Sequence, residues 1–152
     1  KLNDISSRFS LDLIRGSHII LDKKISGHFL FQEDEGDRVV FVLPYLGNTL
    51  VGTTEVPQSI EEPIECAEEE IDYLLDIFNN NFIDNADNSD IISTISGLRP
   101  IVALNMSRND TYYSKASREA ELEVIDKLVC VFGGKWTSAP SLSKLLLKKL
   151  KL

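Results

Sequence analysis

The chain has 152 residues, of which 43% are hydrophobic and 26% are charged, and its formal net charge is −8. These values are ordinary for one globular domain long enough to bury a core, and the acidic balance argues against nucleic acid as a partner. The two cysteines, Cys66 and Cys130, fall in patterns that do not favour a disulfide, and no apolar run approaches the length of a membrane span.

The first third of the chain has the pattern of short strands joined by turns. Apolar runs at residues 18–21, 28–32, 38–43 and 49–54 predict four strands. A polar, glycine-containing segment at 33–37 predicts a hairpin between the second and third strands, and Gly47 with Asn48 predicts a turn after the third. Successive strands with such short connections favour an antiparallel meander.

A helix is predicted next, over about residues 67–81. Several glutamates precede its apolar residues, where the helix dipole favours negative charge. We expect the helix to cover one face of the sheet with its apolar side chains, which recur at helical spacing as Ile71, Leu74, Leu75, Phe78 and Phe82.

The last third of the chain returns to strands before a final helix. A strand is predicted over residues 90–96, ended by Gly97 and Pro100, and an irregular loop over 102–114. Residues 122–125 and 128–132 predict a strand pair around Asp126 and Lys127. The final helix has Pro140 in its first turn, with Ser138 as a candidate N-cap. Its interleaved leucines and lysines fit a core-facing helix with a solvated basic face, or a membrane-surface helix.

The segment after the second strand of that pair carries the strongest signal of a ligand site. Five apolar residues at 128–132 predict a buried strand, and Gly133 and Gly134 then let the backbone turn sharply. Lys135 and Thr137 follow, just before the helix. A strand, a glycine turn and a helix N-terminus make an anion site, although such a turn also serves as a plain connection.

Two further residue types suit chemistry on an oxygen-bearing substrate. Arg99 stands at the end of an apolar strand, next to the rigid Pro100, where it can grip an oxyanion or pair with one of many carboxylates. His18 follows the tight turn at Gly16 and can accept a proton near neutral pH, or be structural. No Cys/His spacing predicts a metal site, and no serine-nucleophile motif occurs.

Six of these segments, in this order, resemble the FAD-dependent glycerol-3-phosphate dehydrogenases, which are D-amino-acid-oxidase-like flavoenzymes. The resemblance extends from about residue 10 to residue 147. The order of the six is more specific than any one of them. They are residues 13–19, 38–45, 50–55, 69–75, 96–100 and 132–137.

The resemblance implies an α+β fold with two parts. Residues 1–126 would form the substrate-binding, or cap, domain with its returning strands, an antiparallel sheet with a covering helix. Residues 127–152 would form a strand, Gly-Gly turn and helix that contribute to the FAD-binding domain. The glycine-rich Rossmann unit that opens the family's chains has no counterpart in these residues. We therefore expect a fragment of a longer enzyme, inactive in isolation.

The resemblance also assigns roles to individual residues. Arg99 and His18 would be catalytic, the first facing the substrate and the second handling a proton. Thr53, Arg118 and Lys135 would bind the substrate. The cofactor-binding residues would be Gly133, Gly134, Lys135, Trp136 and Thr137.

The implied reaction is the oxidation of sn-glycerol 3-phosphate to dihydroxyacetone phosphate, with FAD as cofactor and quinone or oxygen as electron acceptor. Residues 138–140 and 106–114 depart from the family's usual sequence. A related FAD-dependent oxidase of amino acids or hydroxy acids therefore remains an alternative, as does a non-catalytic stand-alone binding domain. We expect a cytoplasmic protein, and the resemblance leaves open a peripheral association with the inner membrane.

Overall fold

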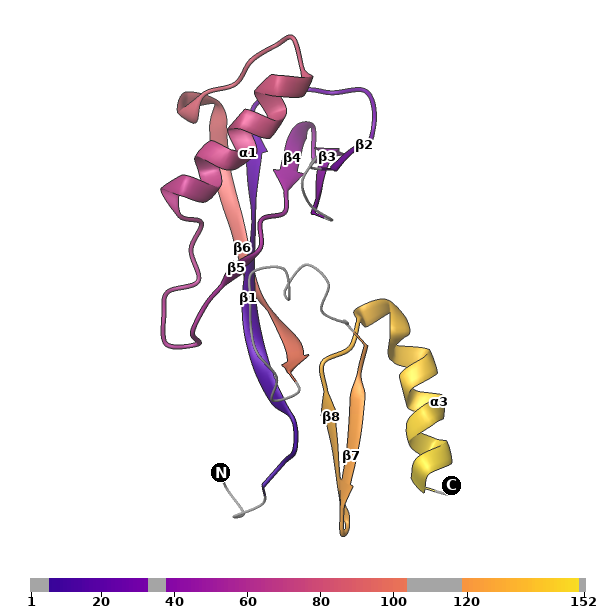
Figure 1. Cartoon of the computed structure of the whole chain (residues 1–152). Coiled ribbons are helices and arrows are strands. Elements are labelled where there is room, and N and C mark those ends of the chain that lie inside the picture. The colour runs from indigo at the N-terminus through magenta and orange to yellow at the C-terminus, as the bar shows by residue number, and fades with distance from the viewer. Residues whose placement is uncertain (1–5, 33–37, 104–118, 151–152) are drawn as a thin grey trace. The chain divides into compact units, whose positions relative to one another are not determined.

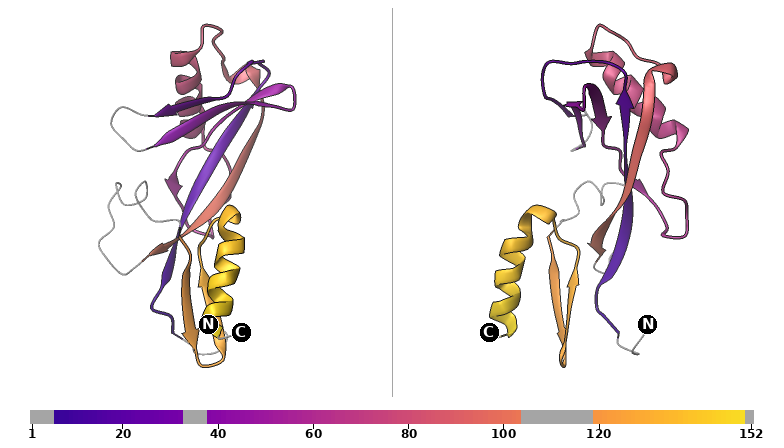
Figure 2. Two further views of the ribbon diagram at one scale, coloured as in Figure 1. Left: turned by 90° about the vertical axis from the view of Figure 1, so that its right-hand side faces the viewer. Right: turned by 180° about the vertical axis from the view of Figure 1, so that it is seen from behind.

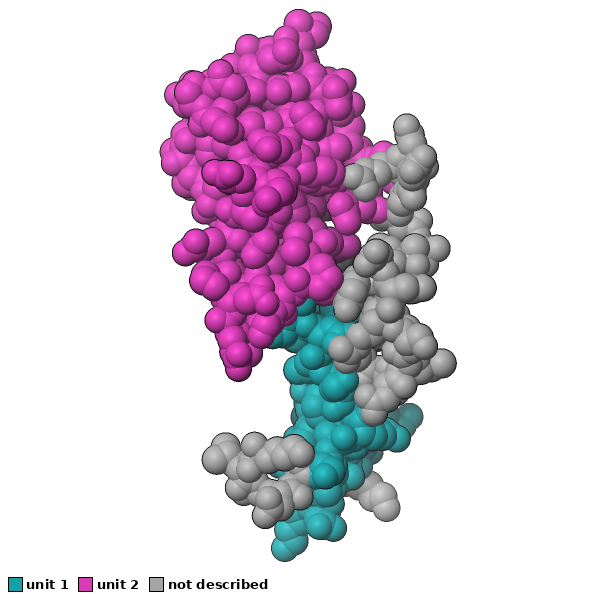
Figure 3. Space-filling view, turned by 60° about the vertical axis from the view of Figure 1, so that its left-hand side comes forward, with its two compact units in different colours: residues 1–13, 100–152 teal, residues 14–99 magenta. Residues whose placement is uncertain are grey.

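The computed structural model describes residues 6–32, 38–103 and 119–150 (Figure 1). Its fold is divided into two compact units, residues 1–13 with 100–152 and residues 14–99 (Figure 3). The predicted hairpin turn at 33–37, most of the predicted loop at 102–114, and Arg118 lie outside the described residues. The predicted division of the chain at residue 126 into cap and FAD-domain parts stays a prediction.

The unit formed by residues 14–99 is built on a six-stranded sheet. The strand order is β2-β3-β4-β1-β5, and β6 also pairs with β1. Every pair along β2-β3-β4-β1-β5 is antiparallel, as the strand patterns predict. The strands are β1 (Ser10–Leu21), β2 (Phe29–Gln32), β3 (Val39–Tyr45), β4 (Asn48–Gly52), β5 (Val56–Pro57) and β6 (Ile91–Ala103).

A two-residue turn sets the register between β3 and β4. Leu46 and Gly47 both have positive φ, at 49° and 86°, and Tyr45 pairs with Asn48 on either side of them. Positive φ at both central residues matches the twist of a tight hairpin. The turn therefore falls one residue earlier than the Gly47–Asn48 position predicted from the sequence.

Helix α1 (Glu68–Asn81) covers one face of this sheet (Figures 1 and 2). Its side chains Leu74 and Phe78 are almost completely buried, and Ile71 is partly buried beside them. They pack on alternate residues of three strands, because side chains two apart in a strand share a face. These strand residues are Ile19, Leu21, Val40, Val42 and Val51. The predicted helix and its covering role are confirmed.

Strand β6 is longer than predicted. It runs from Ile91 to Ala103, straight through Gly97 and Pro100, which were expected to end it. Proline has no N–H to donate to a neighbouring strand, so it is tolerated at the edge of a sheet. In the described chain β6 pairs with β1 alone, and this edge position accommodates Pro100.

The other unit contains the predicted strand pair and the final helix. Strands β7 (Glu121–Ile125) and β8 (Leu128–Phe132) form an antiparallel ladder around Asp126, which has a φ of 54°. A short 3₁₀ turn, η2 (Trp136–Ser138), precedes α3 (Ala139–Leu150). The Ser138 hydroxyl donates to the Lys135 carbonyl at 2.9 Å, so it belongs to the 3₁₀ turn and the predicted N-cap of α3 is wrong.

Helix α3 keeps the predicted Pro140 in its first turn, and none of its residues is buried. No helix among the described residues combines the length and the apolar character that crossing a bilayer requires.

Candidate active site

Arg99 lies on β6 and is held by the segment that follows β4. Its Nη2 donates to the Thr54 carbonyl at 2.9 Å, and its Nη1 lies 3.3 Å from Oε1 of Glu55. The Arg99 side chain is 29% exposed and the Glu55 side chain 12%. The pairing with a carboxylate, one of the two alternatives that the sequence allowed for Arg99, is therefore present.

Gly16 of β1 makes room for Arg99 and for Thr53. A Cβ atom at Gly16 would lie 2.6 Å from the Thr53 hydroxyl and 3.0 Å from Cζ of Arg99, with the Arg99 Nη2 closer still. Real Cβ contacts are longer than this, so only glycine fits between these two side chains without displacing them. Arg99 and Thr53, both predicted site residues, thus meet over one point of β1.

His18 lies two residues further along β1, so its side chain is on the same face of the strand as the Gly16 position. In the β1–β4 ladder His18 pairs with Gly52, and its ring occupies the space that a Cβ at Gly52 would need. Burial, and then the positive charge of Arg99, lower the pKa of the His18 imidazole below its ordinary 6.5. His18 is therefore mostly neutral at pH 7 and able to accept a proton.

Arg99, Thr53 and His18 form a group that we call the Arg99 cluster. A buried polar network adjoins it, because Thr54 contacts both Arg99 and Glu70. The Thr54 hydroxyl donates to Oε1 of Glu70 at 2.5 Å and accepts from the Ser17 N–H at 2.8 Å. The other oxygen of Glu70 accepts from Nη2 of Arg15 at 2.6 Å, and both side chains are largely buried, at 6% and 12% exposure. Arg15 also donates to Gln58. This network ties α1 to β1 and to the segment after β4.

The ionisation of Glu70 follows from these partners. Burial alone would raise the pKa of its carboxyl, but hydrogen bonds from Thr54, the Ala67 N–H and Arg15 outweigh that effect. The pKa of Glu70 consequently lies below its ordinary 4.5, and its carboxylate is ionised at neutral pH. Because Arg15 is paired with the buried Glu70, we interpret it as a residue that stabilises the fold.

The paired glycines after β8 adopt the sharp turn that the sequence predicted. Gly133 and Gly134 have φ values of 68° and 101°, which side chains disfavour. A Cβ at Gly133 would also lie 2.8 Å from Val102, and one at Gly134 would lie 3.2 Å from Ala120. Both positions therefore favour glycine for conformation, and Gly133 also for packing within this unit.

The three predicted site residues after the glycines are at the surface. The Trp136 indole is 95% exposed, and Thr137 is exposed. The Lys135 ammonium lies 3.4 Å from Glu119 with half of its side chain exposed. The turn thus presents a cation and an aromatic ring next to a backbone with positive φ.

Comparison with known protein families identifies the family of this chain. Residues 2–148 match the family model described as FAD dependent oxidoreductase. The chain belongs to the FAD dependent oxidoreductase family.

The chain is similar in sequence to two proteins named as dehydrogenases. It is 31% identical to the aerobic glycerol-3-phosphate dehydrogenase of Escherichia coli, over 96% of this chain and 30% of that protein. It is 32% identical to D-erythritol 1-phosphate dehydrogenase of Brucella abortus, over 96% of this chain and 30% of that protein. The chain therefore spans about 30% of the length of these relatives.

A solved structure supports the fold. The chain superposes on the glycerol-3-phosphate dehydrogenase from Bacillus halodurans complexed with FAD with a TM-score of 0.71, at 23% identity. The match covers 96% of this chain and 28% of that one. At this identity the likeness concerns the fold alone.

The sequence did not single out the groups that hold the candidate catalytic residues in place. Glu55 directly follows Thr53 and Thr54, so its position in that segment was its one sequence signal. Thr54 and Glu70 also stand in segments of the resemblance, but their roles depend on partners from distant parts of the chain, which the sequence does not reveal.

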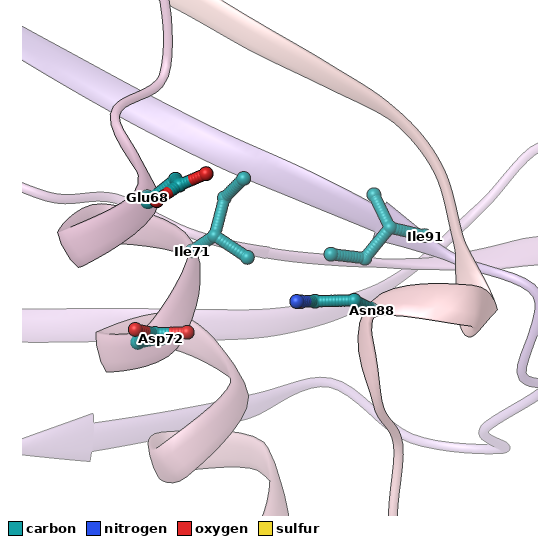
Figure 4. Close-up of a pocket in the computed structure, with 5 residues that line it drawn as sticks. All are labelled: Glu68, Ile71, Asp72, Asn88 and Ile91. Atoms are coloured by element: carbon teal, nitrogen blue, oxygen red, sulfur yellow. The ribbon is translucent and has the colours of Figure 1, made fainter.

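A separate pocket of about 430 Å³ lies between the start of α1 and the start of β6, beside the 3₁₀ turn η1 (Asn88–Asp90) (Figure 4). Its lining is apolar at Ile71 and Ile91, whose side chains face each other, and polar at Glu68, Asp72 and Asn88. None of these lining residues is among the residues predicted for the site.

Proposed function

We propose that this chain carries the substrate-side residues of an FAD-dependent oxidoreductase that oxidises sn-glycerol 3-phosphate to dihydroxyacetone phosphate. The observation that carries the proposal is that Arg99 of β6 and Thr53, which follows β4, meet at Gly16 of β1, on the strand face that also carries the neutral imidazole of His18. The family and the name of the Escherichia coli relative support this choice of reaction.

The oxidation of a secondary alcohol asks two things of the protein besides the cofactor. A base must take the hydroxyl proton, and a cation must stabilise the negative charge that develops on the oxygen. A ring nitrogen of His18, neutral at pH 7, accepts the proton. The guanidinium of Arg99 stabilises the charge, and the Thr53 hydroxyl helps to orient the substrate. When bound, FAD supplies the acceptor for the hydride that leaves C2.

The residues after β8 fit the cofactor's chemistry. FAD is anionic at its pyrophosphate and planar at its ring systems, and the turn offers positive-φ backbone at two glycines, the Lys135 ammonium and the exposed Trp136 indole. We therefore propose that residues 133–137 bind FAD. Residues 127–152 would then belong to the FAD-binding domain and the preceding residues to the cap domain.

Substrate-binding roles for Lys135 and Arg118 rest on the resemblance. Lys135 would serve the substrate as well as the cofactor, and Arg118 would bind the substrate phosphate, and both would add positive charge in an acidic chain. The electron acceptor would be quinone or oxygen, and the protein would be cytoplasmic or peripherally bound to the inner membrane.

A second substrate is favoured by one observation. The Brucella abortus relative is named for D-erythritol 1-phosphate, a longer phosphorylated polyol. The same cluster would serve that substrate, because the secondary hydroxyl that is oxidised has the same chemistry. The alternatives of an amino-acid or hydroxy-acid substrate, or of a non-catalytic binding domain, have no such observation in their favour.

The test is a substrate panel with the whole protein, purified with its flavin. Reduction of an artificial electron acceptor, and consumption of oxygen, would be followed with glycerol 3-phosphate, D-erythritol 1-phosphate, D-alanine and glycolate in turn. We expect kcat/KM to be highest for glycerol 3-phosphate. A higher value for D-erythritol 1-phosphate would move the assignment to that substrate. Activity with D-alanine or glycolate alone, or with none of the four, would refute the proposal.

A further inference from the structure

The segment after β4 holds Arg99 from two adjacent residues. The Thr54 carbonyl accepts from Nη2 of Arg99 at 2.9 Å, and the Glu55 carboxylate lies 3.3 Å from Nη1. Two contacts to two nitrogens of one planar guanidinium fix its rotation as well as its position, which a single ion pair would not do. Gly16 leaves the space into which the guanidinium is directed.

The segment that makes these contacts is itself held in place. The Thr54 N–H donates to the Ser17 carbonyl at 3.2 Å, and the Thr54 hydroxyl bonds to the buried carboxylate of Glu70. Glu70 is anchored in turn by Arg15 and by the Ala67 N–H at the start of α1. Glu55 therefore extends from a rigid base, and its side chain is mostly buried, at 12% exposure.

We propose that Glu55 is a positioning residue for the reaction, acting through Arg99. Its carboxylate sets the orientation in which the guanidinium meets the oxygen of the substrate. The inference rests on the proposed function for its kinetic consequence, but the geometric role of Glu55 is independent of which substrate is used. A misplacement of about 1 Å in a reacting group can lower a rate roughly 100-fold, so a residue that fixes Arg99 has a large effect without touching the substrate.

The alternative is that Glu55 and Arg99 form an ordinary surface pair. Pairs between exposed charges contribute little, because water screens them and both side chains lose freedom. The burial of Glu55, the second contact from Thr54 and the anchoring of Thr54 by Glu70 all distinguish this arrangement from such a pair.

Three substitutions at Glu55 separate geometry from charge. Glu55→Ala removes the acceptor, Glu55→Asp keeps the charge with a shorter reach, and Glu55→Gln keeps an acceptor oxygen at the same reach without the charge. The exposed Glu65→Ala is the matched control. Each would be made in the whole flavin-containing protein, with kcat, KM and melting temperature measured, and a crystal structure determined for each Glu55 variant.

We expect Glu55→Ala and Glu55→Asp to lower kcat/KM roughly 10- to 100-fold. The loss should come from a lower kcat if Arg99→Lys lowers kcat, and from a higher KM if Arg99→Lys raises KM. Glu55→Gln should stay within about fivefold of the wild type, and all melting temperatures within a few degrees. In the crystal structures the guanidinium should leave the Thr54 carbonyl in the Ala and Asp variants and remain there in the Gln variant.

Three results of the kinetic and melting measurements would overturn the proposal. They are near-wild-type kinetics in all variants, activity losses that follow losses of melting temperature, and recovery by Asp but not by Gln, which would make charge alone responsible. An unmoved guanidinium in the Ala variant would overturn it as well. If the wild-type protein does not oxidise glycerol 3-phosphate, only the proposed function fails, because the crystal structures still decide whether Glu55 orients Arg99.

Discussion

Gly16→Ala tests the candidate site with the addition of a single methyl group. The new Cβ would lie 2.6 Å from the Thr53 hydroxyl and 3.0 Å from Cζ of Arg99. Ordinary contacts of a carbon atom are about 3.5–4.0 Å long, so one or both side chains must move by roughly 1 Å. A displacement of about 1 Å at a reacting group lowers rates by up to roughly 100-fold. We expect kcat/KM for glycerol 3-phosphate to fall between about 10- and 100-fold.

Gly97→Ala is the matched control, because Gly97 lies on the same strand as Arg99 and a Cβ there meets nothing within 4 Å. Both variants would be made in the whole flavin-containing protein and compared by steady-state kinetics and melting temperature. The control should stay within about threefold of the wild type, well below the loss expected from displacing a reacting group. If Gly16→Ala behaves like Gly97→Ala, the cluster at Gly16 is not where the reaction takes place.

Three further predictions concern single residues. Arg99→Lys keeps the charge but loses the planar two-pronged geometry, so turnover should fall by roughly 100-fold or more if Arg99 stabilises transition-state charge, whereas a raised KM alone would show that it holds the phosphate. Wild-type kcat/KM should rise with pH through the lowered pKa of His18, below 6.5, and His18→Asn should remove that dependence in a pH–rate profile. Because the pKa of Glu70 is lowered, its stabilising contribution is complete above its ordinary 4.5 and is lost as the pH falls through the folded-state value. Glu70→Gln should lower the melting temperature at pH 7 and flatten its decline as the pH falls below 4.5, and an unchanged decline would contradict the role given to the buried pair.

The parts of the fold that follow from local periodicity could be predicted from the sequence. The apolar residues of α1 recur at 3.6-residue spacing, and this spacing placed the helix to within a residue of Glu68–Asn81. The β7–β8 pair followed from two apolar runs around a polar turn. The extent of β6 did not follow, because proline ends a strand only where a neighbouring strand needs its missing N–H, and glycine weakens a strand without having to end it. That neighbour is β1, almost eighty residues away in the sequence, and local patterns hold no information on such pairing.

The residues of the candidate site also fall into those that the sequence could name and those that it could not. Arg99, His18 and Thr53 stand in short segments that resemble a family, so the sequence could name them. Their supporting partners could not be named, because Arg99 and Glu55 are 44 residues apart and Arg15 and Glu70 are 55 apart. With 24 acidic residues in the chain, composition alone cannot select the partner of either arginine.

The choice of Glu70 shows what the fold adds. Glu68, Glu69 and Glu70 are consecutive and chemically alike, and all three lie in the first turn of α1, where the helix dipole favours them. Successive residues of a helix are about 100° apart around its axis, so only one of the three can be directed at the sheet. That one is Glu70, which is 5% exposed, whereas Glu68 and Glu69 are both exposed. Its position at the third residue of the helix also lets it accept from the Ala67 N–H. One carboxylate thus caps α1, neutralises Arg15 and anchors Thr54, so the orientation of a helix determines where the Arg99 cluster is held.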